Sequence, residues 1–109
     1  MKTYLVDGSF TRPIDFKDPE IAELMKGHMD FLDRGISEGW LLLTGGKFEE
    51  EGGGILIIKA KDREEINAIM DTDPLKIEKI NDYCIKEFGF AKGQDAVKDW
   101  FADAMPSID

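Results

Sequence analysis

The order of apolar patterns along the chain is the feature that most constrains its fold. Short runs of strand-forming residues alternate with longer segments in which apolar residues recur at helical spacing. The expected strands lie at residues 3–6, 40–44, 55–60 and 83–88. Because β-α-β connections are right-handed, the order strand-helix-strand-strand-helix-strand predicts one α+β domain, an antiparallel sheet with both main helices on one face.

Capping signals indicate where the helices begin. Asp18-Pro19 predicts the start of the first helix, since aspartate accepts from free amides and proline suits the first helical position. We expect this helix to end at Gly35 or Gly39. Asp62, followed three residues later by Glu65, forms a capping-box pattern that predicts the second helix.

The residues after the last strand predict a C-terminal amphipathic helix that Pro106 ends. We therefore expect a domain over residues 1–90 and a helical extension over residues 91–109. The apolar positions of this helix are Val97, Trp100, Phe101 and Ala104.

Composition excludes several classes of partner. The chain has 109 residues, with 14 basic and 23 acidic side chains and a formal charge of −9. A nucleic acid or an anionic membrane needs a basic face, so neither is an expected partner. The apolar N-terminal run is too short for a signal peptide or a membrane span, and we expect a cytoplasmic protein. The one cysteine, Cys84, cannot form an internal disulfide and is expected to be a buried, inert thiol.

A single copy of the expected sheet leaves one face without a covering layer. Apolar residues on that face need cover, and a second subunit is the simplest source of it. We therefore expect a homodimer that packs sheet to sheet. The C-terminal helix is an alternative cover for part of the same face.

The single histidine, His28, lies on the apolar stripe of the first helix. Histidine titrates near neutral pH and suits general acid or base catalysis. The alternative is a core histidine whose ring nitrogens are satisfied by neighbours.

Asp73, which precedes Pro74, also allows two interpretations. It is a typical helix N-cap, and it is equally a carboxylate that can orient an imidazole and stabilise its protonated form. The predicted fold places both helices on the same side of the sheet, so His28 and Asp73 can lie close together.

Other candidate binding groups give weaker signals. The amides of Thr44-Gly45-Gly46 can contact an anionic ligand, and Arg12 can supply positive charge, although a strand end and a solvated arginine are the commoner outcomes. The acidic residues 49–51 have no metal-ligand spacing and indicate a solvated hairpin loop. No metal-binding, phosphate-loop, dinucleotide or serine-nucleophile motif is present, so we expect neither a metal nor a cofactor.

Taken together, the ordered motifs resemble the YCII family over residues 3–90. The motifs are His28-x-x-x-Leu32, the run Gly-Trp-Leu-Leu-Leu-Thr-Gly-Gly at 39–46, Gly-Gly-Ile-Leu-Ile-Ile at 53–58, a helix opening at Asp62, and Asp73-Pro74.

This resemblance implies a ferredoxin-like dimeric α+β barrel with a site formed by His28 and Asp73. The sequence departs from the family pattern in two places. It has no arginine shortly before the histidine, where Lys26 lies instead, and it has Gly45-Gly46 where the family has Gly-Pro. Lys26 or Arg12 would have to replace that arginine.

Three functions remain open from the sequence. The first is a small cofactor-independent enzyme, an isomerase, lyase or hydrolase, in which His28 and Asp73 perform acid/base chemistry on a small molecule. The second is a non-catalytic ligand-binding or sensor module on the same fold. The third is an interaction protein, which exposed Trp100 and Phe101 would favour.

Overall fold

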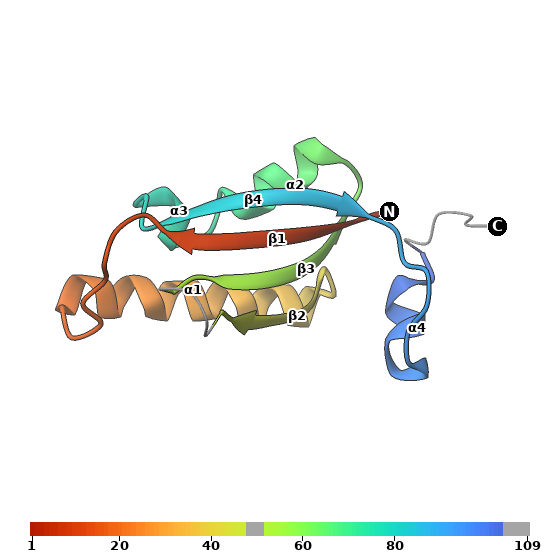
Figure 1. Ribbon diagram of the computed structural model, residues 1–109, viewed down its shortest axis with the longest axis horizontal. Helices are drawn as coiled ribbons and strands as arrows, with labels where there is room; N and C mark the ends of the chain where they lie inside the picture. The colour runs from red at the N-terminus through yellow and green to blue at the C-terminus, as the bar shows by residue number, and fades with distance from the viewer. Residues whose placement is uncertain (48–51, 104–109) are drawn as a thin grey trace.

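The computed structural model describes residues 1–47 and 52–103. Its strands are β1 (Lys2–Phe10), β2 (Leu41–Gly46), β3 (Gly54–Ala60) and β4 (Asn81–Phe88), and its helices are α1 (Pro19–Glu38), α2 (Arg63–Met70), α3 (Pro74–Ile77) and α4 (Asp95–Phe101). The strands form one antiparallel sheet in the order β2-β3-β1-β4 (Figure 1). No helix of the described ranges is long and apolar enough to cross a bilayer. The predicted ferredoxin-like α+β architecture is confirmed.

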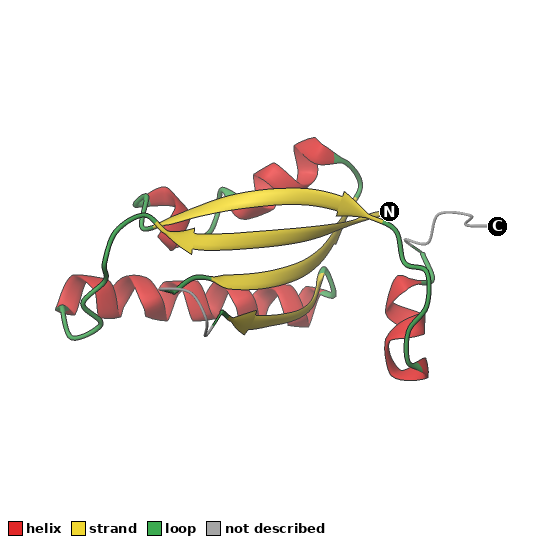
Figure 2. Ribbon diagram, viewed as in Figure 1, coloured by secondary structure: helices red, strands yellow, loops and turns green. Residues whose placement is uncertain are grey.

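Helices α1, α2 and α3 lie on one face of the sheet, as Figure 2 shows. The core lies between that face and the helices, because alternate strand residues point toward them. Its side chains on β1, β3 and α2 are buried completely or almost completely, and include Tyr4, Val6, Leu56, Ile58, Ile66 and Met70.

Local capping positions the helices as predicted. The Asp18 side chain accepts from the Glu20 amide at 2.9 Å, and α1 ends at Gly39, whose φ of 86° suits glycine. Gly35 stays inside the helix, where a Cβ would lie 2.7 Å from the Trp40 ring. Asp62 caps α2 by accepting from the amide of Glu65, whose own carboxylate accepts from the amide of residue 61.

Strand β1 is longer than the sequence pattern predicts. The apolar pattern ends the first strand at residue 6, but residues 7–10 continue the ladder with β4 as far as Phe10 and Asn81. Gly8 pairs with Tyr83, and the tyrosine ring occupies the space that a side chain at Gly8 would take. The strand continues because backbone pairing on both sides outweighs the weak strand propensity of glycine.

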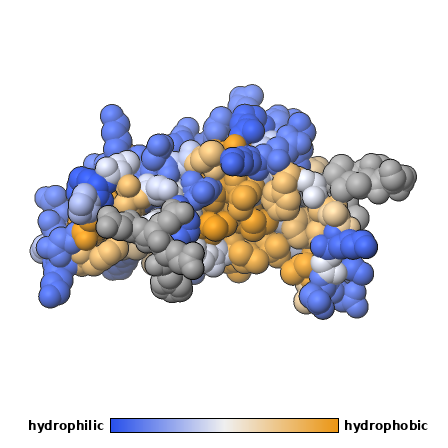
Figure 3. All heavy atoms as spheres, viewed as in Figure 1, coloured by the Kyte–Doolittle hydropathy of each residue, from blue (hydrophilic) through white to orange (hydrophobic). Residues whose placement is uncertain are grey.

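The opposite face of the sheet carries apolar side chains, and no helix of the described residues covers most of its area. Figure 3 shows this face, with a hydrophobic patch across the strands. By strand register the patch includes Leu5, Leu43, Ile57 and Phe88, of which Leu43 is 49% exposed. Cys84 points to the same face and is exposed, so its predicted burial is wrong.

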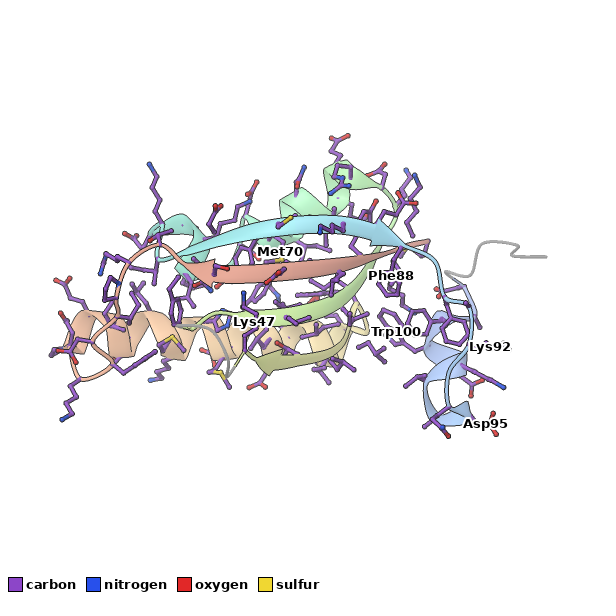
Figure 4. The ribbon with its side chains drawn as sticks, viewed as in Figure 1. Lys47, Met70, Phe88, Lys92, Asp95 and Trp100 are labelled. Atoms are coloured by element: carbon purple, nitrogen blue, oxygen red, sulfur yellow. The ribbon has the colours of Figure 1, made fainter. Side chains whose placement is uncertain are left out.

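Helix α4 packs against one end of the sheet. Trp100 lies on the side of α4 that faces the sheet (Figure 4), and its indole nitrogen donates to the Gly39 carbonyl at 3.0 Å. Phe101 is buried against Phe90 and Phe88, and Lys59 lies over the Trp100 ring. Trp100 is half-buried and Phe101 is buried, so these two residues do not form the exposed aromatic pair that would favour an interaction protein. The expected helix positions at residues 104 and 106 lie outside the described residues, and the division at residue 90 stays a prediction.

Candidate active site

A pocket of about 320 Å³ opens between α1, the adjoining ends of β2 and β3, and the start of β4. His28 contributes to its wall from the inner side of α1. The pocket surface is mostly apolar, and its apolar side chains are Phe10, Met25, Met29, Leu32, Leu56 and Leu75. This surface suits a small molecule with an apolar body.

His28 and Asp73 meet at the edge of this pocket. His28 Nδ1 lies 2.9 Å from Asp73 Oδ1, the His28 side chain is 14% exposed, and Asp73 is fully buried. Asp73 Oδ1 also accepts from the Leu75 amide at 3.1 Å, so this carboxylate caps α3 as well. The same carboxylate oxygen of Asp73 therefore caps α3 and contacts the His28 ring.

Two further side chains, which are not among the site residues predicted from the sequence, extend the hydrogen-bond chain that begins at Asp73. The Tyr83 hydroxyl donates to Asp73 Oδ2, and Asn81 Nδ2 donates to the Tyr83 oxygen at 3.1 Å. Burial, and secondarily the hydrogen bond to Asp73, raises the pKa of Tyr83 well above its usual value, so the phenol remains a donor. In the sequence, Tyr83 could be placed only by the alternation of side chains along the last strand, which directs it to the helix side of the sheet.

Two glycines allow these groups to approach one another. A Cβ at Gly27 would lie 2.9 Å from Cγ of Pro74, so the absence of a side chain lets α1 come close to α3. A Cβ at Gly8 would lie 2.6 Å from the Tyr83 ring. Gly27 adjoins His28 and Pro74 adjoins Asp73, so this contact limits how far apart the two candidate residues lie.

The other candidate residues divide into two groups. Thr44, Gly45 and Gly46 line the His28 pocket. Arg12 does not; it lines a separate polar groove with Asp15 and other residues at the start of α1. Arg12 therefore lines a different groove from Thr44, Gly45 and Gly46.

The geometry around His28 is compatible with proton transfer. No group of three or more potential metal ligands occurs in residues 1–47 and 52–103. Asp73 Oδ1 lies against one ring nitrogen of His28, Nδ1, so Nε2 is the nitrogen left for a bound molecule. A histidine arranged in this way can take up a proton and return it.

Comparisons with known proteins give a family and a fold. No curated protein sequence matches this chain. Among solved structures, the chain is similar to 5-chloro-2-hydroxyhydroquinone dehydrochlorinase from Burkholderia phenoliruptrix AC1100, determined in complex with 2,5-dihydroxybenzoquinone. The TM-score is 0.66 and the identity 13%, over 82% of this chain and 95% of that chain. The sequence profile of the YCII-related domain matches residues 9–89, which include His28, Asp73 and the pocket, and the chain therefore belongs to the YCII-related family.

Proposed function

We propose that this protein is an enzyme that moves a proton on a small molecule, with His28 as general base and acid and Asp73 as its orienting carboxylate. The observation that supports this most is the 2.9 Å contact between His28 Nδ1 and a fully buried carboxylate, at the wall of a pocket. A buried carboxylate that holds an imidazole in one orientation is the arrangement that activates histidine in acid/base catalysis.

The proposed step is a proton transfer that needs no added redox group. A C–H or O–H proton of the substrate passes to His28 Nε2, and the bonding electron pair stays on the substrate. His28 then carries both ring protons, and the negative charge of Asp73 stabilises the imidazolium. Return of the proton to another substrate atom gives isomerisation. Departure of a leaving group with its bonding electron pair gives elimination, and His28 then releases its proton to that group or to water.

The pocket favours a small ring compound with acidic protons. Its apolar wall can hold a planar body, and His28, Thr44 and the backbone at Gly45 and Gly46 can contact polar substituents. The structural neighbour acts on a chlorinated hydroxyhydroquinone and was solved with a dihydroxybenzoquinone. Hydroxylated, enolisable rings are therefore the first compounds to test.

Hydrogen–deuterium exchange on a panel of such rings tests the proposal. Enolisable hydroxylated ring compounds are incubated with the protein in deuterated buffer, and exchange at acidic C–H positions is followed by NMR. We expect the parent to accelerate exchange of at least one compound that it binds, and His28→Gln to bind it without acceleration. Binding without exchange in both proteins would instead support the ligand-binding module, and equal exchange in both would exclude His28 as the base.

We also propose that two copies pair through the uncovered face of the sheet. Leu43 is 49% exposed on this face, whereas Ile36 is 53% exposed on α1, on the far side of the molecule. Leu43→Lys should give monomers in light scattering, because it places a charge in the interface, and Ile36→Lys should leave dimers intact. A monomeric parent, or dimers in both variants, would contradict this assembly.

A further inference from the structure

We propose that Asn81 and Tyr83 are positioning residues that keep Nε2 of His28 free of a proton at neutral pH. This inference rests on the proposed function, and it names two groups that act on His28 through Asp73. It is carried by the direction of the hydrogen bonds that connect Asn81 to the carboxylate.

The structure orients the Asn81 amide with its nitrogen toward the Tyr83 oxygen, and Asn81 Oδ1 is buried without a hydrogen-bond partner among the described residues. The Asn81 side-chain nitrogen can only donate, so its bond to Tyr83 uses a lone pair of the phenol oxygen. The single phenol proton is then available to Asp73 Oδ2. The Leu75 amide, which also can only donate, occupies Asp73 Oδ1. Both carboxylate oxygens therefore accept hydrogen bonds, and this set of donors favours the carboxylate form of Asp73 over the acid.

An ionised Asp73 determines the state of the imidazole. Nδ1 of His28 must carry the hydrogen that it shares with Oδ1, and Nε2 is then the unprotonated nitrogen in the neutral ring. Loss of a donor would destabilise the buried negative charge and make the pair bind a proton more readily. Nε2 would carry a proton in that protonated ring, and also in the other neutral tautomer. In either state it could not act as a base.

The ring of Tyr83 is held in place independently of its hydroxyl. Tyr83 lies over Gly8, where no side chain opposes it, and Gly8 is its partner in the β1–β4 ladder. Phenylalanine can therefore occupy the same position, so Tyr83→Phe removes the donor and keeps the ring. Tyr4 is a matched control, because it lies on the same face of the sheet with a buried hydroxyl that makes no hydrogen bond to any described residue.

The test uses the ¹⁵N NMR signals of the His28 ring, which are unambiguous because the chain has one histidine. At one fixed pH slightly above neutral, the parent should show Nδ1 protonated and Nε2 unprotonated. In Tyr83→Phe the ratio of unprotonated to protonated Nε2 should fall about tenfold, the effect of one lost bond to a charged group. Tyr4→Phe should leave the ratio unchanged.

Asn81→Asp provides a second, nearly isosteric variant. A carboxylate at position 81 accepts the Tyr83 proton and draws it away from Asp73, so Nε2 should again become more protonated. If Tyr83→Phe and Asn81→Asp both match the parent spectrum, the inference is wrong while the His28–Asp73 pair stands. If Nδ1 is unprotonated in the parent itself, the pair fails as well, and with it the proposed function.

Discussion

The two ends of the helix-covered face of the sheet are built differently. Under α2 the face is closed, and Tyr4, Ile58, Ile66 and Met70 are fully buried. Near α3 the same face is open, and a pocket adjoins a chain of hydrogen bonds. The Tyr4 hydroxyl at the closed end has no hydrogen-bond partner among the described residues, whereas the Tyr83 hydroxyl has a donor and an acceptor. Of these two tyrosines, only the one at the pocket end belongs to a polar network, so we attribute stability mainly to the closed end and place the proposed chemistry at the pocket end.

The largest expected effect comes from a cavity at the closed end. Ile66→Ala removes a fully buried side chain and should lower the free energy of unfolding by about 2–5 kcal/mol in a denaturant titration. The ¹⁵N spectrum of His28 should stay as in the parent, because this change is made in the other part of the core. A folded variant with an altered His28 spectrum would show that the two ends are not independent.

Gly27→Ala tests the close approach of α1 and α3. Alanine normally stabilises a helix interior relative to glycine, but here its methyl group would lie 2.9 Å from Pro74. We expect a loss of about 1–3 kcal/mol in unfolding free energy from overpacking, and a weakened His28–Asp73 contact. Ser37→Ala, at an exposed position of α1, is the control and should cause no loss. Equal stability of Gly27→Ala and the parent would show that the helices separate freely.

Alkaline pH should destabilise the protein through its tyrosines. Burial raises the pKa of Tyr83 and of Tyr4, so the unfolded chain releases these protons first as pH rises above about 10. Stability is fully present below that pH and is lost above it, by up to about 1.4 kcal/mol per pH unit for each tyrosine. Tyr83→Phe should make the loss less steep; an unchanged slope would contradict the raised pKa of Tyr83.

The smallest expected effect lies in the turn that leads into β4. Lys79 has a φ of 58°, in the left-handed region that costs most residues about 1–2 kcal/mol. Lys79→Gly should therefore raise the free energy of unfolding by about 0.5–1 kcal/mol, after the greater unfolded-state entropy of glycine is subtracted. A loss of stability would indicate that the Lys79 side chain contributes more than its backbone strain costs.

Features set by neighbouring residues were predictable from the sequence. Asp18 and Asp62 cap helices because their carboxylates reach amides two and three residues away, and the termination at Gly39 follows from its freedom at positive φ. The order of the strands and main helices along the chain followed from the apolar pattern. Strand ends were less predictable, since β1 continues through Gly8 only because partners on both sides hold it.

The site was only partly predictable, because it depends on contacts between distant segments. His28 and Asp73 could be selected by family resemblance, and a shared side of the sheet allowed their contact without requiring it. The roles of Tyr83 and Gly27 depend on which side chain lies opposite them in the folded chain. No local sequence pattern indicates which side chain that is. The position of Arg12 was not predictable either, because it depends on the path of its loop, which places it in a different groove.

The most direct test of the central claim compares the His28 ring in the parent and in Asp73→Asn by ¹⁵N NMR. We expect the parent to have a protonated Nδ1 and a free Nε2. In the variant, the amide oxygen can keep the contacts of Oδ1 with the Leu75 amide and with Nδ1, but the negative charge is lost, so at slightly acidic pH a smaller fraction of the rings should be protonated at both nitrogens. Identical ring spectra in two folded proteins would contradict the claim that Asp73 prepares His28 for proton transfer.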